Sequence, residues 1–236
     1  MRIIPVIDCQ TGIVVHARGG RRQEYRPLES RLIDSTHPRN VATALLSLVQ
    51  SEELYLADLD AIQGAVPDEK LYHDLQLPGA TLWIDAGLCD VQRATDVARW
   101  GRVIIGLETI RSPCDLADIA RVIPPELLIF SLDLRAGDCL GRWGMTPQEV
   151  IETVVHLGIS TVIVLDLADV GMGQGTATAA LCTRTHQRWP MLELIAGGGI
   201  RHRADVEKLA GCGVQGALVA TALHSGTWGD DHGCGA

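Results

Sequence analysis

Residues 194–206 read LIAGGGIRHRADV, a short apolar run that leads through three glycines into a polar, helix-like segment. Residues 82–90, LWIDAGLCD, follow the same plan, but Asp85 stands where the later stretch has a glycine. Each stretch predicts a strand, a tight turn and the start of a helix. The two stretches therefore look like two copies of one strand–turn–helix unit.

Short apolar runs recur along the whole chain, and each is followed by a turn and a helical pattern. The runs are nearly uninterrupted, as expected of strands covered on both faces. Eight such units fit 236 residues, which predicts an α/β fold, a (β/α)8 TIM barrel with parallel strands. An open doubly wound sheet is the alternative, but the glycine-rich turns follow the third and seventh runs and not the first. The predicted strands cover residues 3–8, 53–59, 81–85, 102–106, 127–133, 161–166, 192–197 and 216–220.

The chain also repeats itself, which favours the barrel. VIDCQTG (6–12) resembles SLDLRAG (131–137), with Asp8 and Asp133 at matching places. Further pairs of stretches follow in the same order in both halves, with offsets that drift because loops differ in length. A half-barrel cannot close its own sheet, so two copies of a four-strand unit are expected to make one barrel.

Composition and charge limit the classes of protein to which this chain can belong. Residues 1–226 are expected to form one domain, because no linker divides them, and the glycine-rich residues 227–236 are expected to form a flexible tail. The formal net charge of −9 argues against a nucleic-acid-binding protein. The N-terminal apolar run ends at Asp8 and is too short for a signal peptide or a membrane span.

Seven cysteines are scattered along the chain without a CxxC pair. This usage is typical of free thiols in a reducing cytoplasm, so the protein is expected to be cytoplasmic and to lack a zinc site. His232 and Cys234 in the tail are weak metal candidates, which disorder explains better. No metal and no organic cofactor is predicted, and a monomer or a small homo-oligomer is expected.

Two acidic residues stand at the ends of matching strands. In a barrel, side chains at the carboxyl ends of the strands face the substrate. Asp8 ends the first strand and Asp133 the fifth, so their carboxyl groups are expected to face each other across the mouth. Such a pair in different surroundings is typical of general acid–base catalysis. The alternative is that one of them caps a helix or pairs with an arginine of the first loop.

The glycine-rich stretch predicts an anion site. Glycines let the backbone approach a ligand closely, and the N–H groups at the start of the next helix favour negative charge. GALVATAL (216–223) adds a second turn beside it. A tight turn without a ligand is the alternative. The residues expected to hold a phosphate are Gly198, Gly199, Ala220 and Thr221.

Together, IIPVIDCQTGIVVHARGG, LDLRAG…RWG, IAGGGIRHRADV and the repeat resemble the ProFAR isomerase of histidine biosynthesis and its synthase sister. The resemblance covers residues 2 to about 224, and the isomerase converts the aminoaldose ProFAR into an aminoketose without a cofactor. It implies that Asp133 is the general acid, which protonates the ribose ring oxygen, and that Asp8 is the general base, which removes the C2 proton. It also implies that Trp143 stacks on the base of the substrate.

The chain departs from that family where the family binds a second phosphate. Asp85 and Glu108 stand at or beside this site, and a carboxylate about 5 Å from a phosphate dianion repels it by roughly 6–7 kcal/mol at an effective dielectric of about 20. Helix capping is the alternative role for both residues. Leu165 stands where the family has a threonine. The predicted substrate-binding residues are His16, Arg18, Asp58, Asp85, Glu108, Trp143 and Asp166.

We therefore expect an isomerase-like acid–base enzyme that acts on a phosphorylated sugar amine by an aldose–ketose rearrangement. Its partner is a small phosphorylated molecule, held through one intact phosphate site. Two alternatives remain open. The first is an enzyme of pterin or furan C1-carrier biosynthesis that acts on another substrate, and the second is a barrel that binds a phosphorylated ligand or a partner subunit without catalysis.

Overall fold

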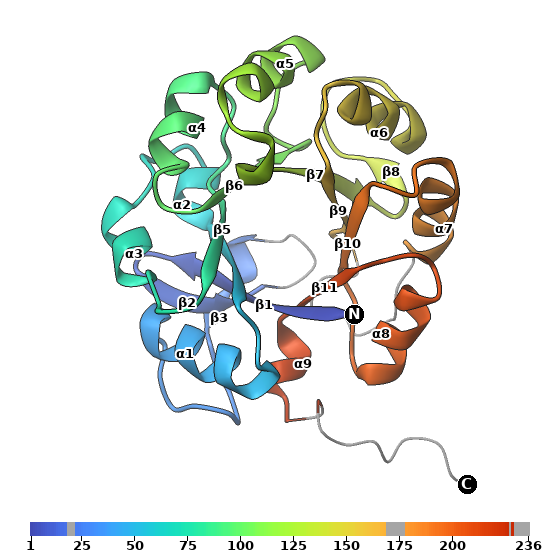
Figure 1. Cartoon of the computed structure of the whole chain (residues 1–236). Helices are drawn as coiled ribbons and strands as arrows, with labels where there is room; N and C mark the ends of the chain where they lie inside the picture. Colours follow the sequence, from blue (N-terminus) through green and yellow to red (C-terminus); the bar gives the residue numbers. More distant parts are fainter. Residues whose placement is uncertain (18–21, 169–177, 227, 229–236) are drawn as a thin grey trace, which may run out of the picture.

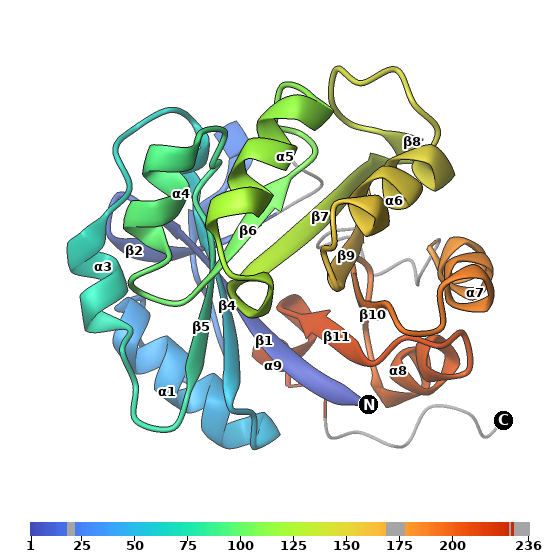
Figure 2. The ribbon, with the colours of Figure 1, turned by 45° about the horizontal axis from the view of Figure 1, so that its top comes forward.

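The chain folds into a closed barrel, which the computed structural model describes over residues 1–17, 22–168, 178–226 and 228. Eight parallel strands follow one another around the barrel, and β11 pairs with β1 to close it (Figure 2). The (β/α)8 prediction is confirmed, and the ends of the predicted strands differ from the observed ones by two residues at most. In order, the barrel strands are β1 (Arg2–Gln10), β4 (Glu53–Asp58), β5 (Thr81–Asp85), β6 (Arg102–Gly106), β7 (Leu128–Arg135), β9 (Thr161–Asp166), β10 (Glu193–Gly197) and β11 (Gly216–Val219).

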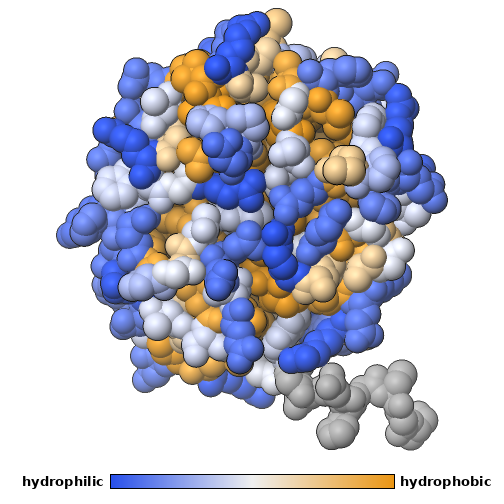
Figure 3. Space-filling view, viewed as in Figure 1, coloured by the Kyte–Doolittle hydropathy of each residue, from blue (hydrophilic) through white to orange (hydrophobic). Residues whose placement is uncertain are grey.

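Helices form a ring around the strands (Figure 1). Several begin at a side-chain cap, as at Asp90, Ser112 and Thr146, whose oxygens accept from backbone N–H groups in the first turn. Hydrophilic residues lie along the rim of the view in Figure 3, with hydrophobic residues scattered inward of them. No helix in the described part of the chain is long and apolar enough to cross a membrane. The helices are α1 (Pro38–Val49), α2 (Leu59–Ile62), α3 (Glu69–Asp74), α4 (Val91–Val97), α5 (Pro113–Val122), α6 (Pro147–His156), α7 (Ala179–Arg188), α8 (Arg203–Ala210) and α9 (Thr221–His224), with short 3-10 turns η1 (Arg22–Glu24) and η2 (Pro125–Leu127).

The two halves of the barrel share one strand register. Asp8 on β1 lies opposite Ala57 on β4, and Asp133 on β7 lies opposite Leu165 on β9. An offset of 125 residues relates the first strands of the halves, and an offset of 108 relates the second strands. With these offsets, each residue pair in the register of β1 and β4 matches a residue pair in the register of β7 and β9. The predicted half-barrel repeat is therefore present in the hydrogen-bonded register.

Two antiparallel hairpins extend the barrel at equivalent places. β2 (Ile13–His16) pairs with β1 and with β3 (Arg26–Pro27), and β8 (Asp138–Cys139) pairs with β7. Each hairpin turns through two residues of positive φ. These are Thr11 (50°) and Gly12 (80°) in the first half and Ala136 (52°) and Gly137 (86°) in the second. The apolar pattern of the sequence does not predict these strands, because turn geometry rather than a long apolar run sets such short segments.

The barrel interior is filled below the site. At the amino ends of the strands, Arg2 forms an ion pair with Glu53 at 3.4 Å, and the guanidinium of Arg102 lies 4.7 Å from the ring centre of the fully buried Trp83. A layer of apolar side chains lies above, to which Ile4, Ile104, Ile129, Ile163, Ile195 and Leu218 contribute. This packing leaves the carboxyl end of the barrel as the place for a cavity.

Candidate active site

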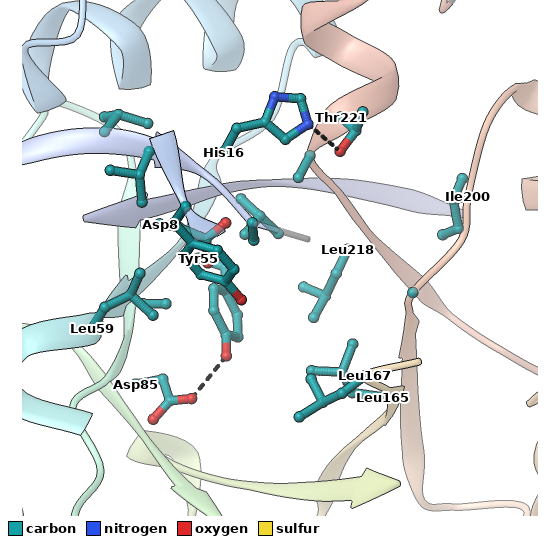
Figure 4. A pocket seen from close by; sticks show the side chains of 18 of the residues that line it. Asp8, His16, Tyr55, Leu59, Asp85, Leu165, Leu167, Ile200, Leu218 and Thr221 are labelled. Atoms are coloured by element: carbon teal, nitrogen blue, oxygen red, sulfur yellow. Dashed lines mark hydrogen bonds between the residues drawn. The ribbon is translucent and has the colours of Figure 1, made fainter. Parts of the chain in front are cut away.

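A cavity of about 310 Å³ opens at the carboxyl ends of the barrel strands. All eight strands, or the turns that follow them, contribute to its lining. Figure 4 looks into this cavity and shows that its side chains come from elements far apart in the chain. Parallel strands in a barrel all end at one rim, so both halves of the repeat meet here.

Asp8 and Asp133 line this cavity from opposite sides of the barrel. β1 and β7 are four strands apart in the closed ring of eight, which is the largest separation the ring allows. The two residues are equivalent in the repeat, so the difference between them comes from their neighbours. The arrangement places two carboxyl groups around one space, as general acid–base chemistry requires.

The carboxyl group of Asp133 is enclosed. Its side chain is 7% exposed, Oδ1 accepts from the Ser131 hydroxyl at 2.6 Å, and Oδ2 accepts from the Glu108 backbone N–H at 3.1 Å. Burial raises the pKa of Asp133 to about 7, against the hydrogen bonds from Ser131 and Glu108 and with the help of the Asp85 charge. Asp133 is therefore able to carry a proton near neutral pH.

Asp8 has different surroundings. It is more exposed than Asp133, and the apolar Val6 stands at the repeat position of Ser131. The repeat thus presents one enclosed and one open carboxyl group to the same cavity.

One end of the cavity is lined by two glycines of positive φ. Gly198 and Gly199 adopt φ values of 89° and 71°, and both line the cavity together with Ala220 and Thr221. A Cβ atom on Gly198 would lie 2.7 Å from the carbonyl oxygen of Asp166, so only glycine fits there. His16 joins this end, with Nε2 lying 3.3 Å from the Thr221 hydroxyl (Figure 4).

His224 lines the cavity behind Thr221. Its imidazole is 5% exposed, and Nδ1 lies 3.0 Å from the hydroxyl of Ser30. Burial, and then the charge of His16, lowers the pKa of His224 to about 4. A neutral imidazole therefore stands behind Thr221 at physiological pH.

The repeat-related end is built differently. Asp85 occupies the position of Gly197, and Ala86, which does not have positive φ, occupies that of Gly198. The Asp85 carboxylate accepts from the Tyr55 hydroxyl at 3.0 Å and from the Gly87 backbone N–H at 3.2 Å. Glu108 also lines the cavity. Gly87 keeps the positive φ of Gly199 (62° against 71°), so the two ends differ at the two preceding positions and in the carboxyl groups of Asp85 and Glu108.

Comparison with known proteins assigns the chain to a family. The family described as histidine biosynthesis protein matches residues 2–228. The chain belongs to this histidine biosynthesis family. An uncharacterized protein of Methanocaldococcus jannaschii is 28% identical to it over 96% of this chain and 94% of the relative. The ProFAR isomerases of Halorhodospira halophila and Deinococcus radiodurans are 30% and 28% identical, each over 96% of this chain and 93% and 94% of the relative. The relatives that carry a functional name here are thus isomerases.

Three of the residues that were predicted to bind the substrate do not line the cavity. Asp58 is 2% exposed and accepts from Ala61 N, Asp68 N and the Tyr72 hydroxyl. Asp166, 1% exposed, accepts from the backbone N–H groups of residues 136, 137 and 168 and so holds the β7–β8 turn. Both carboxylates serve the scaffold in this structure.

Trp143 also lies away from the cavity. Its indole N–H donates to the carbonyl of Ile110 at 3.3 Å, and its ring centre lies 6.0 Å from that of Phe130. Phe130 points outward from β7, because Asp133, three positions later, points inward. Arg18, the remaining predicted contact, falls outside the described residues.

Sequence reasoning missed Tyr55, Gly106 and His224 as parts of the site. Tyr55 has the strand parity of Ala57, which also lines the cavity, so alternation along ELYLAD was a usable signal. Nothing in the local sequence marks Gly106 as the neighbour of Asp133. Within the described part of the chain, no three His, Cys, Asp or Glu side chains are grouped to hold a metal ion.

Proposed function

We propose that this protein is an acid–base isomerase that acts on a phosphorylated sugar amine and interconverts its aldose and ketose forms. The observation that carries the proposal is the pair Asp8 and Asp133, which are equivalent in the repeat but differ in enclosure. Relatives named ProFAR isomerase, at 28–30% identity, support the reaction class. The family model matches residues 2–228, so the proposal concerns the barrel itself.

The chemistry divides between the two carboxyl groups. Asp133 is the proton donor, because burial raises its pKa to about 7. It delivers its proton to the ring oxygen of the aldosylamine as the C1–O bond breaks, which leaves a C1 iminium ion. Asp8 then takes the proton from C2, and the enol that forms becomes the ketone as C1 gains a proton. The substrate keeps its composition, because one hydrogen has moved from C2 to C1, and the proton that Asp133 gives to the ring oxygen is balanced by the proton that the C2 hydroxyl loses.

One phosphate group is proposed to lie at the end formed by Gly198, Gly199, Ala220 and Thr221. Positive φ at the two glycines and the side chains of His16 and Thr221 support this placement. At the opposite end, Asp85 and Glu108 line the cavity, and a phosphate dianion there would meet their charges. The substrate is therefore proposed to end in a neutral, cationic or hydrogen-bond-donating group on that side.

Turnover assays test the reaction. Purified protein would be incubated with ProFAR and with an aminoaldose that carries one phosphate, and the ketose product followed by mass spectrometry. Asp8→Asn and Asp133→Asn should each lose about 100-fold or more in kcat, the usual contribution of a general acid or base. Asp90→Asn, at the cap of α4, is the matched control. Full turnover by Asp133→Asn would contradict the proposal.

Crystals grown in inorganic phosphate test the one-phosphate assignment separately. A single anion is expected, at the Gly198–Gly199 turn. A second anion at Asp85 would restore a substrate with two phosphates, as ProFAR has. Density at neither turn would remove the anion site from the proposal.

A further inference from the structure

We propose that Leu165 determines substrate specificity, and that Leu165 and Leu218 form an apolar wall against which the phosphate-bearing part of the substrate packs an apolar face. The inference deepens the proposed function and rests on it, because it takes the turn at Gly198 and Gly199 as the phosphate site. It names the chemistry of the group next to the phosphate. That group presents C–H bonds to the wall and keeps hydroxyl groups away from it.

The two leucines meet over Gly197. β9 and β11 flank β10, and Leu165 on β9 pairs in register with Gly197, the last residue of β10. A Cβ atom on Gly197 would lie 3.0 Å from Cδ1 of Leu165 and 3.3 Å from Cδ1 of Leu218. Both side chains thus reach one point from the two neighbouring strands. Because Gly197 has no side chain, the leucines cover it as one apolar surface.

This wall faces the cavity and adjoins the phosphate end. Leu165 and Leu218 both line the cavity, and Leu165 is only half-buried. Gly198 follows Gly197 directly, so the wall borders the turn of positive φ. Figure 4 shows both leucines on the side of the cavity away from Asp85. Apolar surface that is open in a concave site favours a ligand that covers it with apolar surface of its own.

The wall also lies between the phosphate end and the acid. Leu165 pairs in register with Gly197 on one side and with Asp133 on the other. A substrate that reaches from the turn at residues 198–199 to Asp133 therefore passes beside Leu165. The leucine side chain has no group that could pair with a hydroxyl on that stretch, and a hydroxyl buried there without a partner would weaken binding.

The other half of the barrel carries different chemistry at the equivalent positions. Ala57 and Asp85 stand in the places of Leu165 and Gly197, and they pair with each other in the same register. Both line the cavity, so that half presents a methyl group and a carboxylate. A sugar ring with C–H bonds on one face and hydroxyl groups on the other can meet both sides. The wall thus decides which face of the substrate lies towards β9 and β11.

Two phosphate monoesters with the same carbon chain test the wall without a turnover assay. n-Propyl phosphate has no hydroxyl groups, and glycerol 3-phosphate differs from it only in its hydroxyl groups. NMR titration of the full-length protein should give a dissociation constant about tenfold lower for propyl phosphate. Leu165→Asn, of similar size but polar, should remove most of this preference. Leu165→Ala, which copies Ala57 and is tolerated there, should reduce it several-fold.

Inorganic phosphate and a second leucine provide the controls. Both Leu165 variants should still bind inorganic phosphate, which does not reach the wall. Leu59→Ala is the matched variant, because Leu59 also lines the cavity but lies on its other side, away from the glycine turn (Figure 4). It should keep the preference for propyl phosphate.

The outcomes separate this inference from the proposed function. If wild type binds the two esters equally, or if Leu59→Ala loses the preference as fully as Leu165→Ala, the wall does not select the substrate, even where an aminoaldose turns over. If the preference depends on Leu165 but no aminoaldose turns over, the wall stands and the isomerase proposal fails. If neither ester nor inorganic phosphate binds, the inference is overturned together with the phosphate site, and the turnover of Asp133→Asn alone judges the acid–base chemistry.

Discussion

Gly106 on β6 provides the space that the Asp133 carboxylate occupies. The Cβ atom of an alanine at position 106 would lie 2.9 Å from Oδ2, the oxygen that accepts from the Glu108 N–H. In the repeat, Gly106 corresponds to Ala220, and the neighbouring acid there is the more exposed Asp8. Glycine, which has no methyl group, thus lies beside the enclosed acid, and alanine lies beside the more exposed one.

Gly106→Ala should therefore disturb the acid. We expect a fall in kcat of about tenfold or more, and a loss of about 1–3 kcal/mol in the free energy of unfolding through overpacking. Gly211→Ala, at the end of α8, is a matched control, because its nearest neighbour would be an ordinary 3.4 Å away. Kinetics and urea unfolding of the two variants give the comparison. If Gly106→Ala kept the kcat of wild type, a displacement of Asp133 would have no effect on catalysis.

Asp133 should make the protein less stable as pH rises. Its pKa is about 7 in the folded state against an ordinary 3.8, so the folded state holds the extra proton between these values. Stability from this group is full below pH 4 and is lost as pH rises through 7, by about 4 kcal/mol in all. In urea unfolding, the free energy of unfolding of Asp133→Asn relative to that of wild type should rise by about this much between pH 4 and pH 8. A difference that does not change with pH would contradict the raised pKa.

His224 should act in the opposite direction. Its pKa falls from 6.5 to about 4 on folding, so the unfolded chain binds the proton first as pH drops. Stability from this group is full above pH 6.5 and is lost as pH falls towards 4, by about 3 kcal/mol. His224→Gln should remove this loss of stability. The measurement is the difference in the free energy of unfolding between the variant and wild type, at pH 8 and at pH 4. An equal difference at the two pH values would refute the assignment.

Gly198→Ala should destroy the anion end. The backbone there has φ of 89°, and a Cβ atom would lie 2.7 Å from the Asp166 carbonyl oxygen. We expect a loss of about 1–3 kcal/mol in stability and no rise in Tm with inorganic phosphate, whereas we expect phosphate to stabilise wild type by mass action. Ala86→Gly changes the equivalent position of the other half and should keep the phosphate response. A response that survives in Gly198→Ala would place the anion elsewhere.

The repeated strands were predictable because their signals are local. Apolar runs of strand length recur with turns between them, and the offset that relates Asp8 to Asp133 is also the offset of the strand register. Positive φ at Gly198 follows from the glycine-rich turn itself. These features need only neighbouring residues, so they could be inferred without coordinates.

The roles of other acids were not predictable in this way. Asp58 and Asp166 are the last residues of their strands, and Asp8 lies two residues before the end of β1. Yet Asp58 accepts from the Tyr72 hydroxyl, and Asp166 holds the turn after β7. Trp143 packs against the outward face of β7. A strand end predicts that a side chain is near the rim, and only the neighbouring elements decide whether it faces the cavity.

By itself, the sequence determined the barrel, its two-fold repeat and the placing of one acid at the end of each matching strand. It did so because hydrophobic period, turn glycines and repeat spacing are properties of short stretches. Only the tertiary structure decided which acid is enclosed and that Tyr55 reaches Asp85. The desolvation and charge that a carboxyl group experiences come from strands separated by tens of residues, and these meet only when the barrel closes.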